Sequence, residues 1–237
     1  MNHPIVQSCC GITLVGGGPV SGRDMALALR RAPVVVAVDS GADRARALGQ
    51  MPCAVIGDLD SISDAARAAM PAGTVHLLGE QETTDFDKAL RSVAAPFVLG
   101  LGFTGARMDH GLAVYNALVR HPGRHCLVIG PQDVVFAAPP ELHLALALGD
   151  RVSLFPMAAV TGDSRGLEWP LQGIAFAPDA MIGTSNRAVA REVTLRFDGP
   201  GMLVILPRNR LDAAITALTG ISPPWPDAPA PSAVRGR

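Results

Sequence analysis

The octapeptide AVIGDLDS, at residues 54–61, is the most informative segment of this chain. Its first three residues are apolar and uncharged, as in the buried strands of parallel sheets. Two carboxylates follow at once, Asp58 and Asp60. Alternate residues of an extended chain point the same way, and at a rise of about 3.3 Å per residue they lie roughly 6–7 Å apart. The segment therefore predicts two acids aimed into one cleft where a buried strand ends.

Two like charges in one cleft repel each other unless a cation lies between them or one is protonated. Ligands of parallel sheets bind at the carboxyl ends of the strands. The cation that best suits carboxylate ligands and a phosphorylated substrate is Mg²⁺. Asp58 and Asp60 are therefore candidate metal ligands, while Asp60, Ser61 or Ser63 is also suited to cap the helix that follows.

Short apolar segments alternate with Ala- and Arg-rich helical segments over residues 1–131. This alternation predicts an α/β domain in which helices flank a parallel sheet. The expected strands are residues 12–15, 34–38, 54–56, 75–78, 97–101 and 126–129. The expected helices include residues 24–31, 65–70 and 85–93.

The pattern changes after Pro131, where short strand-like runs are separated by Pro and Gly. Residues 132–221 are therefore expected to form a C-terminal antiparallel β-sandwich domain. Its expected strands are residues 134–137, 142–148, 151–155, 193–197 and 202–206, with one short helix at 212–218. The Pro-rich segment 222–237, which includes Trp225, is expected to be a disordered tail.

The composition argues against several classes of function. The 237 residues carry a net charge of −1, so no basic surface for nucleic acid is expected. No apolar run approaches the ~20 residues of a membrane span, and the N-terminus has no signal-like stretch. We therefore expect a cytoplasmic protein that binds neither nucleic acid nor membranes.

A glycine-rich turn follows the first expected strand. Gly16, Gly17 and Gly18 occupy it, and Asp39 lies at the end of the second expected strand. With Gly22, this arrangement is similar to a dinucleotide-binding fingerprint. A phosphate site for another nucleotide, or a tight turn that needs positive φ, explains the glycines as well. Asp39 is suited to bind a metal or a ribose, and Asp39 or Ser40 could instead cap the next helix.

The segment from Thr83 to Lys88 opens the fourth expected helix. Thr84 and Asp87 have the spacing of a capping box. Asp85 and Lys88 are three residues apart and share one helix face. Lys88 is the only lysine among 20 Lys and Arg residues, which favours a specific role for its compact ammonium group. A helix start with these groups is a competent phosphate site.

Residues 102–110 combine flexible glycines with charge after the fifth strand. Arg107 is suited to contact phosphate, and Asp109 to cap the next helix or bind metal. His110 has no partner His or Cys at ligand spacing, which favours a polar surface residue over a metal ligand.

Three residues of the second domain are candidate substrate contacts. Trp169 is suited to stack on a flat heterocycle or to fill the core of the sandwich. Ser185 and Asn186 are suited to hydrogen-bond a ligand or to form a turn.

The order of these motifs resembles the thiamin pyrophosphokinase family. The resemblance runs from about residue 14 to residue 206. The segments that carry it are DSGADR at 39–44, IGDLDS at 56–61, QETTDFDK at 81–88, GARMDH at 105–110, GLEWPL at 166–171 and GTSN at 183–186. The chain departs from residues that are usual in the family at Ser40, Asp43, Ala106 and Glu168.

The resemblance implies an α/β catalytic domain, a β-sandwich thiamin-binding domain and a homodimer. It also implies transfer of a pyrophosphoryl group from ATP to thiamin, which gives thiamin diphosphate and AMP, with Mg²⁺ as cofactor. Carried over by residue, the metal would be held by Asp58, Asp60 and Asp85, with Asp39 nearby. The triphosphate and its nucleophile would be lined by Gln81, Lys88, Arg107 and Asp109. The thiamin side, within one subunit or across the dimer, would be formed by Trp169, Ser185 and Asn186.

Two other functions are compatible with parts of the sequence. A dinucleotide-dependent oxidoreductase would use Gly16–Gly18 and Asp39, but it leaves the acidic segment without a role. A non-catalytic nucleotide or thiamin sensor would keep the fold, although pure binding rarely needs so many carboxylates. Formation of AMP from ATP distinguishes the kinase from both.

Overall fold

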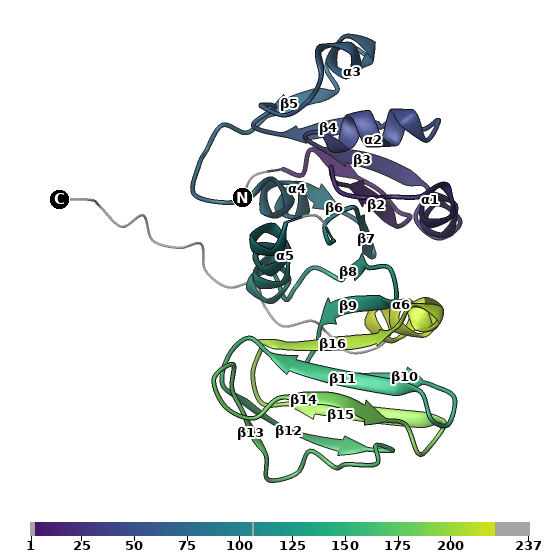
Figure 1. Ribbon diagram of the computed structural model, residues 1–237, viewed down its shortest axis with the longest axis vertical. Coiled ribbons are helices and arrows are strands. Elements are labelled where there is room, and N and C mark those ends of the chain that lie inside the picture. The colour runs from purple at the N-terminus through teal and green to yellow at the C-terminus, as the bar shows by residue number, and fades with distance from the viewer. Residues whose placement is uncertain (1–2, 106, 221–237) are drawn as a thin grey trace, which may run out of the picture.

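A ten-stranded sheet forms the centre of the molecule (Figure 1). The computed structural model describes residues 3–105 and 107–220. Ala106 and the expected tail at 222–237, with Trp225, lie outside the described residues. The strand order is β14-β11-β16-β9-β8-β7-β2-β3-β4-β5.

Six neighbouring strands of this sheet are parallel, as the alternating pattern predicts. They are β5 (Val75–Leu77), β4 (Ala54–Gly57), β3 (Val34–Val38), β2 (Ile12–Val15), β7 (Val98–Leu101) and β8 (Cys126–Ile129). The strands β2, β3, β4, β7 and β8 are buried almost throughout, which explains why their sequences contain no charged residue.

Four antiparallel strands continue the same sheet. They are β9 (Asp133–Ala137), β16 (Met202–Pro207), β11 (Arg151–Pro156) and β14 (Gly183–Arg187). The change of direction occurs between β8 and β9, where Leu127 pairs with Phe136. The sheet therefore runs without a break across the expected boundary at residue 131, and the division into domains stays a prediction.

A separate antiparallel sheet packs on the antiparallel part of the large one. Its strands are β10 (Glu141–Ala145), β15 (Glu192–Phe197), β12 (Val160–Arg165) and β13 (Ala175–Phe176). Leu142 and Leu195 of this sheet share a core with Leu154 and Val204 of the large one. The short strands β1 (Val6–Gln7) and β6 (Val93–Ala94) form a small parallel pair. The predicted fold class, an α/β sheet with an antiparallel sandwich, is confirmed.

Helices cover both faces of the large sheet (Figure 1). On one face, α4 (Asp85–Ser92) and α5 (Met108–Arg120) pack through Phe86, Leu90 and Val114. The opposite face carries α1 (Gly22–Leu29) and α6 (Leu211–Thr219), which follows the turn η1 (Arg208–Arg210). The remaining helices are α2 (Gly41–Ala47) and α3 (Asp64–Ala69).

The helix starts follow ordinary capping chemistry in three cases. Ser21 forms a reciprocal capping box with Asp24 at α1, and Ser63 caps α3. Thr84 accepts a hydrogen bond from the Asp87 amide, but the Asp87 carboxylate turns elsewhere, so the expected capping box is only half formed. Ser40 precedes α2 without a side-chain cap, so this residue does not cap the helix. Among the helices described, none has the length and apolar character of a membrane span.

Candidate active site

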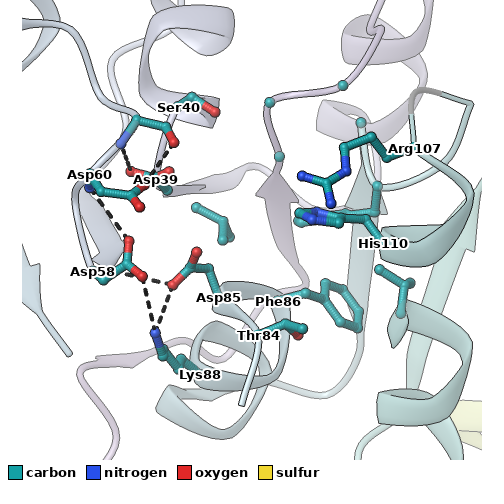
Figure 2. Close-up of a pocket in the computed structure, with 18 of the residues that line it drawn as sticks. Asp39, Ser40, Asp58, Asp60, Thr84, Asp85, Phe86, Lys88, Arg107 and His110 are labelled. Carbon is teal, nitrogen blue, oxygen red and sulfur yellow. Dashed lines mark hydrogen bonds and ion pairs between the residues drawn. The ribbon is translucent and has the colours of Figure 1, made fainter. Parts of the chain in front are cut away.

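A cleft of about 530 Å³ lies where β2, β3, β4 and β7 end (Figure 2). Its acidic wall is formed by Asp39, Asp58, Asp60 and Asp85. Arg107 and His110 lie across from this wall, and Phe86 and Phe103 form an aromatic pair at the base with ring centroids 4.6 Å apart. The cleft therefore combines opposite charges with an apolar base, at the end of the sheet where parallel folds bind their ligands.

The glycine-rich turn lines this cleft because the backbone is crowded there. A Cβ atom on Gly18 would lie 2.6 Å from the Gly102 carbonyl oxygen, and one on Gly17 would lie 2.2 Å from the Ser40 Oγ. None of Gly16, Gly17 and Gly18 has a positive φ, so the explanation by a left-handed turn is wrong. Close approach of the Gly102 main chain and of the Ser40 and Phe103 side chains is the physical reason for these glycines.

Two residues of the acidic wall region adopt the left-handed conformation. Asp39 has φ 48° and Leu59 has φ 62°. A non-glycine residue in this region costs about 1 kcal/mol or more and persists only where its surroundings hold it. Leu59 is buried among Ala42, Val55 and other apolar residues, which fixes the loop and leaves the acids on either side facing the cleft.

Three carboxylates converge closely enough to hold one ion. Each of Asp39, Asp58 and Asp60 places an oxygen within 4.8 Å of the other two. A donor set of carboxylate oxygens suits Mg²⁺ or Mn²⁺ rather than a soft metal. The converging acids differ by one residue from the metal ligands that the family resemblance implies, because Asp39 takes the place of Asp85. The left-handed turn at Asp39 has no local sequence signal, which is why the closeness of this acid was underestimated.

Asp85 lies beside this group and is engaged with other partners. Its Oδ1 accepts hydrogen bonds from the Asp58 amide at 3.2 Å and from Lys88 Nζ at 3.0 Å. Lys88 Nζ also lies 3.7 Å from Asp58 Oδ2, and its side chain is only 2% exposed. The single lysine of the chain is therefore the internal counter-ion of two acids.

Burial raises the pKa of Asp39 above its ordinary value, and the negative charge of Asp85 adds to this shift. Hydrogen bonds from Ser61 and Ser40 act in the opposite direction but do not cancel it. A bound cation reverses the balance because it stabilises the ionised carboxylate. A cation in the cleft would therefore favour the ionised form of Asp39.

Arg107 lines the cleft and pairs with Asp109. Arg107 Nη2 lies 2.5 Å from Asp109 Oδ2, and this hydrogen bond lowers the pKa of Asp109 to about 2. Asp109 does not cap α5, whose N-cap position is Arg107. Gln81 is exposed, and neither Gln81 nor Asp109 is among the described residues that line the cleft. His110 is exposed, as expected of a surface residue, and it also lines the cleft together with Arg107.

Trp169 lies on the surface rather than in the core. It is 54% exposed, and the Arg187 guanidinium lies over its ring at 5.6 Å from the centroid. Arg187 also forms an ion pair with Glu168, with Nη2 to Oε1 at 2.8 Å. The alternative of a core-filling indole is therefore wrong, and the exposed ring face is available for stacking.

Asn186 holds the turn that carries Trp169. Its Oδ1 accepts from the Trp169 amide at 3.2 Å, and its Nδ2 donates to the Trp169 carbonyl at 2.7 Å. Ser185 has φ 64°, a left-handed conformation within β14, and its amide donates to Ser153 Oγ. The buried Asn186 amide is thus already bonded to protein and positions the indole.

The structure does not bring the Trp169 group to the acidic cleft within one chain. The strand β14, which carries Ser185 and Asn186, is separated from β2 by five intervening strands. At about 4.8 Å per strand this corresponds to roughly 30 Å across the sheet. The predicted site residues therefore form two groups at distant places on the molecule (Figure 1).

Sequence reasoning overlooked the aromatic base of the cleft. Phe86 lies inside a quoted motif and Phe103 follows the fifth strand, but only the packing of α4 against the segment after β7 brings their rings together. The position of Phe86 within the segment at residues 81–88 was the available sequence signal for an aromatic contact in the cleft.

Two family models match this chain in the same order as its motifs. Thiamin pyrophosphokinase, catalytic domain, matches residues 25–128. Thiamin pyrophosphokinase, vitamin B1 binding domain, matches residues 140–201. A rice protein, thiamine pyrophosphokinase 1, is 25% identical over 172 residues, which cover 65% of this chain and 64% of the rice protein. The match thus spans slightly less than two thirds of that relative.

Solved structures share the fold. Thiamine pyrophosphokinase from Bacillus subtilis is 24% identical with a TM-score of 0.67, over 83% of this chain and 98% of that one. Thiamin pyrophosphokinase from Candida albicans is 13% identical with a TM-score of 0.71, over 83% and 90%. The yeast enzyme is 14% identical with a TM-score of 0.69, over 88% and 93%. With both domain models matched in order, the chain belongs to the thiamin pyrophosphokinase family.

Proposed function

We propose that this chain transfers a pyrophosphoryl group from ATP to thiamin, giving thiamin diphosphate and AMP. The observation that carries the proposal is the convergence of Asp39, Asp58 and Asp60 beside Lys88 at the carboxyl edge of the sheet. Carboxylates that close together repel each other, and a divalent cation brought by a triphosphate would relieve this repulsion.

Mg²⁺ would be held by Asp39, Asp58 and Asp60, with Asp85 as a further ligand when nucleotide binds. When bound, the ion neutralises phosphate oxygens and spreads the charge that develops during transfer. The sequence-based set of Asp58, Asp60 and Asp85 remains part of this proposal, since Asp85 adjoins Asp58.

The remaining groups of the cleft orient the triphosphate. The bare backbone of Gly17 and Gly18 allows phosphate to approach, and the start of α4, which lines the cleft, would offer main-chain N–H groups to it. Lys88 and Arg107 add fixed positive charge near the transferred group. A cleft carboxylate accepts the proton of the thiamin hydroxyl, which attacks the β-phosphorus because AMP is the leaving group.

Thiamin would bind at Trp169, Ser185 and Asn186 of a partner subunit. Within one chain these residues are roughly 30 Å from the acids, too far for a single small substrate to span. Exposed apolar side chains beside this group, Met181, Ile182 and Val189, and others on α5, Met108 and Leu112, are suited to a subunit contact. A homodimer therefore brings the two halves of one active site together. The expected cytoplasmic location stays a prediction.

An assay of AMP release tests the proposal. Purified protein is incubated with ATP, with and without thiamin and Mg²⁺, and AMP is quantified. We expect AMP only when all three are present. Tight NADH binding without AMP release would favour an oxidoreductase, and ATP or thiamin binding without turnover would favour a sensor.

Asp58→Asn provides the matched site variant. The substitution keeps the shape of the side chain and its acceptor for the Asp60 amide. We expect a folded protein with turnover lowered at least ~100-fold, since loss of a ligand weakens metal binding. Near-normal AMP release by the folded, metal-saturated variant would contradict the assignment.

A further inference from the structure

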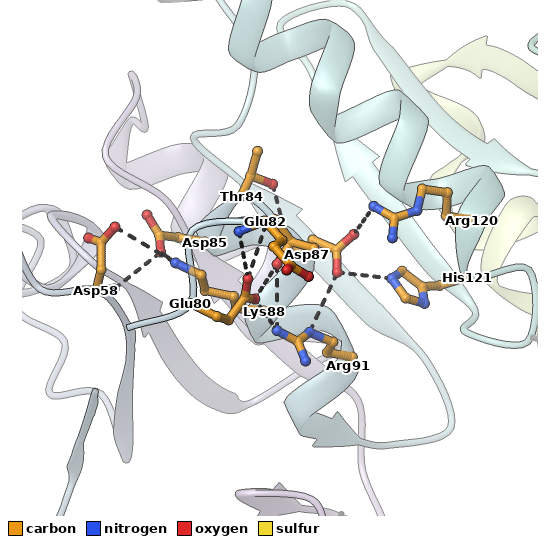
Figure 3. A network of polar contacts seen from close by, with 11 residues as sticks. Asp58, Glu80, Glu82, Thr84, Asp85, Asp87, Lys88, Arg91, Arg120 and His121 are labelled. Atoms are coloured by element: carbon orange, nitrogen blue, oxygen red, sulfur yellow. Dashed lines mark hydrogen bonds and ion pairs between the residues drawn. The ribbon is translucent and has the colours of Figure 1, made fainter. Parts of the chain in front are cut away.

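Two consecutive charged residues of α4 are buried and point in different directions (Figure 3). Lys88 faces the cleft and contacts Asp85 and Asp58. The Asp87 side chain, 3% exposed, faces the end of α5 instead. The proposed chemistry uses Lys88 but leaves the buried acid beside it without a role.

Three basic side chains surround Asp87. Arg120 Nη1 lies at 3.0 Å from Oδ2, and His121 Nε2 and Arg91 Nε lie at 3.1 and 3.6 Å from Oδ1. These contacts tie α4, which carries Asp87, to the end of α5, which carries Arg120 and is followed by His121.

A second carboxylate orders the segment before α4. Glu80 accepts hydrogen bonds from the amides of Glu82 at 3.0 Å and Thr83 at 3.1 Å, and from the Thr83 hydroxyl. Thr83 and Thr84 line the active-site cleft. The conformation of this segment thus depends on Glu80.

Arg91 connects these two carboxylates. Its Nη2 contacts Glu80, and its Nε lies near Asp87, one helical turn away. Among the contacts of the described residues, no other side chain touches both acids. Arg91 itself is not among the residues that line the cleft, so it touches neither the metal group nor the substrate.

We infer that Arg91 is a positioning residue for the metal and phosphate site. Through Glu80 and Asp87 it fixes the first turn of α4, which places Asp85 and Lys88 against Asp58. The inference rests on the proposed function for the identity of the ligands. A displacement of about 1 Å at reacting groups costs up to roughly 100-fold in rate. Arg91 therefore affects the rate strongly although it lies outside the cleft.

The test compares Arg91→Met with wild type in binding and in kinetics. The Arg91 side chain is 40% exposed and methionine keeps its apolar stem, so the variant is expected to fold. The Mn²⁺ affinity should fall about 10-fold, measured by electron paramagnetic resonance without substrate. The KM for ATP should rise about 10-fold. The KM for thiamin should stay within about twofold, because the residues proposed to bind thiamin, Trp169, Ser185 and Asn186, make no contact with Arg91.

Three further variants make the result decisive. Arg196→Met removes an exposed ion pair with Glu141, at 2.7 Å, far from the cleft and serves as the matched control. Glu80→Gln breaks the same link from the other side and should repeat the Arg91→Met pattern. Arg91→Lys keeps the charge and should recover part of the metal affinity.

Unchanged Mn²⁺ affinity and unchanged KM for ATP in folded Arg91→Met would overturn the inference. Equal losses in Arg91→Met and Arg196→Met, or a loss confined to thermal stability, would overturn it too. The proposed function is judged separately, by whether wild-type protein forms AMP and thiamin diphosphate.

Discussion

Lys88 Nζ lies 3.0 Å from Asp85 Oδ1 in a site where the lysine side chain is almost fully buried. The same ammonium lies 3.7 Å from Asp58. Lys88 thus keeps two acids in place beside the metal group before any ligand binds, through a compact ammonium group that is almost fully buried.

Replacing Lys88 by Met should therefore affect both stability and turnover. The two acids are 20% and 28% exposed, so we expect a loss of about 2 kcal/mol, below the ~3–5 kcal/mol of fully buried pairs. Turnover should fall at least ~100-fold, because fixed charge at the transferred group is lost. Urea unfolding and AMP release measure the two effects.

Lys88→Arg serves as the charge-preserving control. Its stability and its turnover should both remain below those of wild type. Added Mg²⁺ should recover part of the stability of Lys88→Met, since a cation again opposes the acids. A Lys88→Met protein that is as stable and active as wild type would contradict this role.

The four acids of the cleft should differ in their contribution to metal binding. Asp39→Asn, Asp58→Asn and Asp60→Asn should each weaken Mn²⁺ binding at least ~10-fold without nucleotide, because these carboxylates converge. Asp85→Asn should weaken it less, because Asp85 is engaged with Lys88. Titration by electron paramagnetic resonance gives each affinity, and a larger loss in Asp85→Asn than in Asp39→Asn would favour the sequence-based ligand set.

Asn186 should act on thiamin through Trp169. Asn186→Ala removes both hydrogen bonds to the Trp169 main chain, so the indole loses its fixed position. We expect the KM for thiamin to rise about 10-fold while the KM for ATP stays within about twofold. Steady-state kinetics with each substrate varied provides the check, and a parallel rise of both KM values would indicate general unfolding instead.

Asp24 should make stability depend on pH at acid pH. Burial raises its pKa, but hydrogen bonds from Ser21 and the contact with Arg208 at 2.5 Å outweigh this, so the folded pKa lies below its ordinary value. Such a group stabilises the protein above the ordinary pKa of about 3.9 and loses that effect as pH falls through the folded value.

Asp24→Asn should therefore cost about 1 kcal/mol at pH 7, and the difference from wild type should shrink between about pH 5 and pH 2. Urea unfolding at several pH values follows this change. Asp64→Asn, at an exposed first-turn acid of α3, is the matched control. A stability difference between wild type and Asp24→Asn that grows as the pH falls would contradict a lowered pKa of Asp24.

Local patterns were sufficient for most elements of the fold. The buried parallel strands are largely apolar and carry no charged residue, and α4 begins at Asp85, as the Thr84 signal predicts. The continuity of the sheet could not be read locally, because the pairing of Leu127 with Phe136 joins segments that look like ends of separate domains. Sheet order depends on long-range pairing, which no single window of sequence contains.

The residues of the site that lie within short sequence motifs could be predicted. Asp58, Asp60, Asp85 and Lys88 were identified from their motifs, and the structure brings them to one wall. The place of Asp39 within the metal group depends on a left-handed turn, and the role of Asn186 depends on a contact 17 residues away. The Asp87 partners come from the end of α5, so that network is visible only in three dimensions.

The most direct test follows labelled phosphate from ATP through one reaction. Wild-type protein is incubated with thiamin, Mg²⁺ and ATP labelled at either the α- or the γ-phosphate, and the products are separated. The γ-label should appear in thiamin diphosphate and the α-label in AMP, because the pyrophosphoryl group moves as a unit. Label in thiamin monophosphate with ADP as co-product, or no labelled thiamin from folded and metal-saturated protein, would contradict the account.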